Sequence, residues 1–186
     1  MKYNEEFPVV IGRTKYNGTI PKDLHTLPMK MGTSHYISID KNVLELDFLR
    51  EIKDFILTNL KKYFVDIVKE PHVQPYVTQS WLNTTEKNQL THPHRHPNSI
   101  VSGVFYTNAN DSIIFYNGKT ETFGASLSKK YDVATGDLLL FPSSLMHYVP
   151  KHEDTFKRTS IAFNTFAHGQ FGNPDILTGL NVNYGY

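Results

Sequence analysis

The sequence contains no cysteine among its 186 residues. This excludes disulfides, and it also excludes thiolate ligands for a structural zinc ion or an iron–sulfur cluster. An excess of charge of one sign is also lacking. The net charge is only +1, so the sequence shows no electrostatic footprint for nucleic acid. No apolar run is long enough to span a bilayer, and the first residues lack the pattern of a signal peptide. We therefore expect a cytoplasmic protein with neither a membrane nor a nucleic-acid partner.

Internal repeats and low-complexity linkers are absent too, so we expect one domain over residues 1–186. Residues 1–42 have the character of short strands and turns, with candidate strands at 7–11 and 36–39. The next segment, 43–70, contains apolar residues at three- and four-residue steps, which predicts a long supporting helix with one face against a sheet. These apolar residues are Leu49, Ile52, Ile56, Leu60, Phe64 and Ile67.

From residue 76 onward, short strands dominate. They are expected at 77–82, 100–106, 112–116 and 138–141 and through Ile161, with a further strand or a lid at 127–134. Many short strands with Gly, Asn and Asp turns after a helix predict a mainly β protein, a double-stranded β-helix or jelly roll, with its barrel over 76–167. Residues 168–186 form either a flap over a substrate or a tail docked on the barrel or on a second subunit, so a homodimer is possible.

Three histidines indicate a metal site. His94 and His96 are one residue apart and could converge on one ion from a strand end, and His147 follows the buried strand that Pro142 ends. Three such ligands on one face leave the opposite face open, as in non-haem iron oxygenases. The alternative is a histidine-rich surface loop that binds metal adventitiously. His92 is a competing ligand, whereas His152 and His168 are most simply surface residues.

An anion clamp is predicted behind this site. The segment 158–164 alternates polar and apolar residues, so Arg158 and Ser160 share a face. Arginine offers a planar fork that binds a carboxylate bidentately, and serine adds a neutral donor. The alternative is an exposed arginine paired with Glu153 or Asp154.

The chain resembles the 2-oxoglutarate and Fe(II)-dependent oxygenases, and among them a group found in marine bacteriophages and bacteria. The resemblance spans about residues 76–167. It rests on Ser80-Trp81-Leu82-Asn83, His94-Arg95-His96-Pro97-Asn98-Ser99, Ser102-Gly103-Val104-Phe105-Tyr106, Gly136-Asp137-Leu138-Leu139-Leu140-Phe141-Pro142-Ser143-Ser144, His147 and Arg158-Thr159-Ser160-Ile161-Ala162-Phe163-Asn164. If the gene is carried by a phage, the protein would act in the host cytoplasm.

The resemblance implies that His94 and His147 bind iron and that Arg158, with Ser160, holds the 2-oxoglutarate carboxylate. His96 stands where the wider superfamily has Asp or Glu, so the third ligand is either His96 or water. Asn83 matches an asparagine that contacts 2-oxoglutarate in several relatives, and its alternative is a turn residue at a strand end.

The activity implied is hydroxylation of a C–H bond in a peptidyl, amino-acid or small-molecule substrate, with O₂ consumed and succinate and CO₂ released. Two other functions stay open. One is a cupin-like metal enzyme that does not use 2-oxoglutarate, and the other is a non-catalytic jelly-roll module for binding or phage structure.

Overall fold

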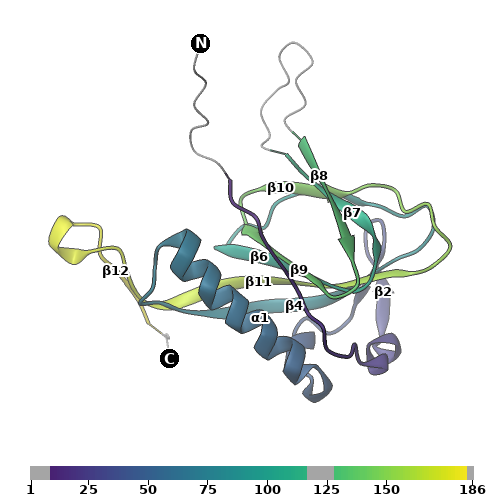
Figure 1. Ribbon diagram of the computed structural model, residues 1–186, viewed down its shortest axis with the longest axis horizontal. Helices are drawn as coiled ribbons and strands as arrows, with labels where there is room; N and C mark the ends of the chain where they lie inside the picture. The colour runs from purple at the N-terminus through teal and green to yellow at the C-terminus, as the bar shows by residue number, and fades with distance from the viewer. Residues whose placement is uncertain (1–8, 117–127, 184–186) are drawn as a thin grey trace, which may run out of the picture.

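The computed structural model describes residues 9–116 and 128–183. Its strands form two antiparallel sheets (Figure 1). The larger sheet has the order β1-β9-β6-β11-β4-β3-β2, with β12 added to β11, and the smaller sheet has the order β5-β10-β7-β8. The sheets face each other as in a jelly roll, which confirms the mainly β, double-stranded β-helix prediction.

The bounds of the larger sheet's strands are β1 (Gly12–Lys15), β2 (Met29–Met31), β3 (Tyr36–Ser38), β4 (Gln74–Thr85), β6 (Val101–Asn108), β9 (Asp137–Pro142), β11 (Arg158–Phe171) and β12 (Leu180–Val182). The smaller sheet consists of β5 (Thr91–His94), β7 (Asn110–Tyr116), β8 (Ser128–Ala134) and β10 (Met146–Val149). Every strand predicted from residue 76 onward is present, and residues 128–134 form a strand of the smaller sheet.

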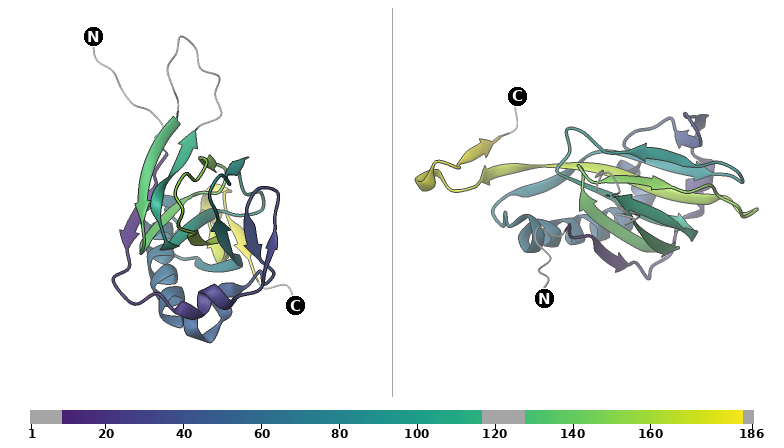
Figure 2. Two further views of the ribbon diagram at one scale, coloured as in Figure 1. Left: turned by 90° about the vertical axis from the view of Figure 1, so that its right-hand side faces the viewer. Right: turned by 90° about the horizontal axis from the view of Figure 1, so that it is seen from above.

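Helix α1 (Arg50–Tyr63) packs on the outer face of the larger sheet, away from the smaller sheet (Figure 2). Its residues Ile52, Ile56 and Leu60 are almost fully buried there. The space between the two sheets holds a second apolar cluster that includes Phe115 and Phe141. Strand β9 is covered on both faces, and its side chains alternate between the two clusters. Its sequence is therefore a continuous run of apolar residues.

The supporting helix predicted over 43–70 is present, but it is shorter than predicted and not α-helical throughout. Short 3₁₀ turns at Val43–Glu45 and Asp47–Leu49 precede α1, and a π-helical turn at Phe64–Val68 follows it. A π-turn adds about one residue per turn and rotates the following side chains off the helical face. Ile67, predicted to be buried, is therefore 38% exposed.

Two further differences lie near the ends of the chain. In the predicted strand 7–11, residues 7 and 8 lie outside the described part, and residues 9–11 precede β1 without forming a strand. Strand β11 continues to Phe171 and pairs with β12, which forms a hairpin that projects from the barrel (Figures 1 and 2). No helix in the described residues is long and apolar enough to cross a membrane.

Candidate metal centre

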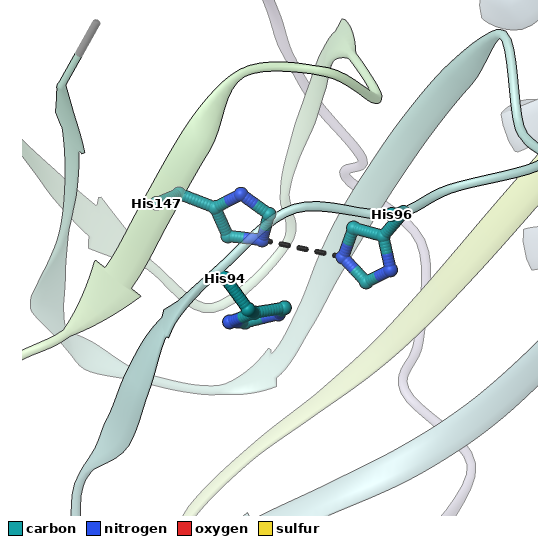
Figure 3. A group of neighbouring side chains, drawn as sticks. All are labelled: His94, His96 and His147. Atoms are coloured by element: carbon teal, nitrogen blue, oxygen red, sulfur yellow. Dashed lines mark hydrogen bonds between the residues drawn. The ribbon is translucent and has the colours of Figure 1, made fainter. Parts of the chain in front are cut away.

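The three predicted histidines lie together between the two sheets. Strands β5 and β10 pair with His147 opposite His94, and His96 follows two residues after the end of β5. One ring nitrogen from each histidine lies within 4.8 Å of those of the other two. Figure 3 shows the three rings facing a common point, with the Nε2 atoms of His96 and His147 3.3 Å apart.

The backbone fixes which ring nitrogen faces this point. The Nδ1 atom of His94 lies 2.7 Å from the carbonyl oxygen of His92, and the Nδ1 atom of His147 lies 3.0 Å from that of Leu145. A neutral imidazole that donates through Nδ1 keeps its Nε2 lone pair for a metal. His92 is exposed and contributes its carbonyl group, so its ring is not part of the cluster.

Burial keeps two rings of the cluster uncharged, those of His96 and His147. This burial, together with the neighbouring His94, lowers the pKa of His147 to about 3 and that of His96 to about 4. A metal binds only the neutral form of histidine, so no proton has to leave these two rings at neutral pH before a metal can bind. No carboxylate joins the cluster among the described residues. The donor set therefore fits a divalent transition metal held by three imidazoles.

Arg158, Ser160 and Asn83 line the same cavity of 160 Å³ as the three histidines. Ser160 on β11 lies opposite Asn83 on β4, and Arg158 is two residues before Ser160. Arg158 is 3% exposed, and its Nε and Nη1 atoms have no hydrogen-bond partner among the described residues. Buried guanidinium donors of this kind require an acceptor, and the carboxylate of a small acid meets that requirement.

Tyr106, which ends one of the segments that carry the family resemblance, lines the same cavity. Its ring lies 5.3 Å from the guanidinium carbon of Arg158, and its buried hydroxyl group has no hydrogen-bond partner among the described residues. Burial raises the pKa of this hydroxyl group, an effect that the nearby Arg158 opposes. Tyr106 is therefore a neutral donor beside the unsatisfied donors of Arg158.

The acidic neighbour of Arg158 is Asp111, not Glu153 or Asp154. One oxygen of Asp111 lies 3.8 Å from Nη1 of Arg158 and 3.0 Å from Nδ1 of His152. His152, expected on the surface, is only 2% exposed, because its Nε2 atom also contacts the carbonyl oxygen of Phe156 at 2.7 Å. The loop after β10 folds back over β7, a long-range contact that no local sequence pattern reveals.

The position of Asn83 bears on one of its two predicted roles, that of a turn residue at a strand end. It lies within β4, nine residues after the strand's first residue Gln74, and its backbone pairs with β3 and β11. The turn interpretation is therefore wrong, and its side chain lines the cavity. His35, which the sequence did not single out, lines the cavity beside it.

Comparison with known proteins agrees with this geometry. Residues 79–164 match the family described as "Putative 2OG-Fe(II) oxygenase". The search among curated proteins found no match. The matched residues contain all three histidines together with Asn83, Arg158 and Ser160, and they do not bear on the expected phage or marine source.

Solved structures share the fold. A 2OG-Fe(II) oxygenase family oxidoreductase from Burkholderia pseudomallei is 14% identical, with a TM-score of 0.56 over 76% of this chain and 73% of that chain. HygX from Streptomyces hygroscopicus, with nickel and 2-oxoglutarate bound, is 12% identical, with a TM-score of 0.58 over 77% and 74%. A prolyl-4-hydroxylase from Pseudomonas putida is 13% identical, with a TM-score of 0.56 over 83% and 91%.

Proposed function

We propose that the chain is a 2OG-Fe(II) oxygenase, the family that its residues 79–164 match, and that it uses Fe(II) and 2-oxoglutarate as its cofactors. His94, His96 and His147 hold the iron. Arg158, assisted by Ser160 and Asn83, binds the distal carboxylate of 2-oxoglutarate. The reaction is hydroxylation of a C–H bond in a peptidyl, amino-acid or other small substrate.

One observation carries this proposal. The three imidazoles and the unsatisfied donors of Arg158 face the same cavity between the two sheets. A metal-binding face and a carboxylate-binding cation in one small cavity suit a ligand that has a chelating end and a distal carboxylate. 2-Oxoglutarate has both groups, and HygX, which shares the fold, was solved with it.

Different residues orient the metal ligands and bind the cosubstrate in a cavity that excludes water. The backbone carbonyl groups of His92 and Leu145 hold two of the imidazoles in the orientation that metal binding requires. The guanidinium of Arg158 fixes the far end of the cosubstrate, and burial strengthens this contact because water does not screen it. Iron with 2-oxoglutarate and O₂ supplies an oxidant for C–H bonds, with release of succinate and CO₂.

A three-histidine site has a consequence for charge. A carboxylate in place of His96 would remove one unit of positive charge from the iron, whereas three neutral imidazoles leave the full charge of Fe(II) to be balanced by 2-oxoglutarate. We therefore expect iron and 2-oxoglutarate to bind with strong mutual dependence. Iron alone should bind more weakly than in a site that contains a carboxylate.

The experiment that tests the activity is the formation of succinate from labelled 2-oxoglutarate with Fe(II) under air, with and without added peptides and amino acids. Wild-type protein should form succinate, and the His147→Ala variant should not. His92→Ala is the matched control, because it removes an exposed ring and keeps the backbone carbonyl group.

Two results would count against the proposal. Iron binding without succinate formation would favour a metal enzyme that does not use 2-oxoglutarate. Equal succinate formation by the wild type and His147→Ala would assign the turnover to free iron in solution. Stimulation of turnover by one class of additive would identify the class of substrate.

A further inference from the structure

The turn between β2 and β3 brings a fourth histidine to the cavity. His35 immediately precedes β3, and its Nε2 atom lies 3.1 Å from the side-chain oxygen Oδ1 of Asn83. Both residues line the cavity that holds the metal cluster and Arg158. His35 lies outside residues 79–164, the part of the chain that matches the family.

The backbone holds this histidine firmly in place. Ile37 on β3 lies opposite Asn83 on β4, so the β2–β3 hairpin is attached to the larger sheet at the position that it contacts. The amide of Gly32 donates to the carbonyl oxygen of His35 at 2.8 Å and closes the turn. The distance between the two side chains is therefore set by sheet pairing.

The chemistry of the cavity decides the direction of the hydrogen bond. If Nε2–H of His35 donates to Oδ1 of Asn83, the Asn83 amide nitrogen remains free to donate to an anion near Arg158. The opposite amide orientation would direct an acceptor oxygen at the same anion, which is unfavourable. Ser34 supports the first arrangement, because its hydroxyl group lies 3.4 Å from Nδ1 of His35 and can donate to it.

We propose that His35 is a positioning residue that orients the amide of Asn83 as a donor to the cosubstrate carboxylate. This rests on the proposed function, in which Asn83 contacts 2-oxoglutarate. His35 itself touches no reacting atom. Its role gives the N-terminal hairpin, which the family match does not include, a part in building the cosubstrate site.

The test is a double-mutant cycle with His35→Ala and Asn83→Ala. The dissociation constant of 2-oxoglutarate is measured anaerobically with Fe(II), from the visible absorption of the chelated cosubstrate. Each single variant should weaken binding by about three- to tenfold, the effect of one net hydrogen bond. The double variant should be no weaker than Asn83→Ala, because His35 acts through Asn83.

Two further variants separate this role from a structural one. His35→Gln keeps a side-chain N–H donor and should recover part of the affinity, and His25→Ala removes an exposed histidine of the same N-terminal segment and should change nothing. A second readout without cosubstrate is the NMR resonance of the Asn83 side-chain amide. It should shift in His35→Ala and stay near its wild-type position in His25→Ala.

Additive losses in the double variant, or an unchanged Asn83 amide resonance in His35→Ala, would overturn the proposal. So would normal 2-oxoglutarate affinity in either single variant. These outcomes differ from failure of the proposed function, in which the wild type itself would show no absorption from chelated 2-oxoglutarate. In that case the Asn83 resonance still tests the contact between the two side chains.

Discussion

Removing the guanidinium of Arg158 should weaken 2-oxoglutarate binding and leave iron binding intact. The side chain is almost fully buried, and it lines the same cavity as the metal cluster without being one of the three clustered ligands. In Arg158→Ala the distal carboxylate would lose its charged partner. It would instead face Asp111, whose oxygen lies 3.8 Å from Nη1 of Arg158 in the wild type.

The magnitude follows from the contacts. A hydrogen bond to a charged group contributes about 1.5–3 kcal/mol, which corresponds to a roughly 10- to 150-fold weaker dissociation constant. Exposure of the cosubstrate to the negative charge of Asp111 places the expected loss toward the upper end of this range. Arg158→Lys keeps the charge and loses the planar fork, so its loss should be smaller.

The assay is an anaerobic titration of the iron-loaded protein with 2-oxoglutarate, with iron affinity and thermal unfolding measured in parallel. Lys157→Ala is the matched control, because it removes the neighbouring cation, which is exposed and pairs with Glu86. Unchanged 2-oxoglutarate affinity in Arg158→Ala would refute the clamp. Loss of iron with retained folding would also contradict the division of the cavity into a metal end and a carboxylate end.

Three other predictions test the metal cluster and the fold. His96→Asp should bind iron more tightly, since a carboxylate adds negative charge at the metal; an unchanged iron affinity in an iron titration would place His96 outside the ligand set. Ile56→Ala should lower the free energy of unfolding by about 2–5 kcal/mol in urea denaturation, because Ile56 is fully buried under the sheet, and a smaller loss would argue against that packing. Burial raises the pKa of Tyr63 to about 12 from 10.0, so the folded protein keeps a proton that the unfolded chain loses. The free energy of unfolding should therefore fall as the pH rises from about 10 to 12, and this component should be absent in Tyr63→Phe.

The sequence was sufficient for the parts of the site that local patterns encode. The alternation of Arg158 with Ser160 follows from strand geometry, in which every second side chain shares a face, and the one-residue spacing of His94 and His96 predicted their convergence at the end of β5. The position of His147, just after a buried strand that Pro142 ends, predicted that it lies at the edge of the next strand, where it can face the barrel mouth. The strands were predictable because most carry apolar runs or alternating patterns between turn residues.

The remaining features depend on contacts between distant segments. His35 and Asn83 are separated by 48 positions, and only the pairing of β3 with β4 brings them together. His152 and Asp111 meet because a loop folds back, and neither has a neighbour in sequence that signals burial. The π-turn at Phe64–Val68 was hidden because its apolar residues continue the helical spacing.

The central claim is that iron and 2-oxoglutarate share the cavity formed by the three histidines and Arg158. Anaerobic titration of the metal-free protein with Fe(II), followed by 2-oxoglutarate, tests it most directly, because chelation of the cosubstrate to iron produces a weak visible charge-transfer band. The account predicts that the band appears in the wild type and is lost in His147→Ala. Iron binding without the band would contradict the shared site, and absence of iron binding would contradict the metal centre itself.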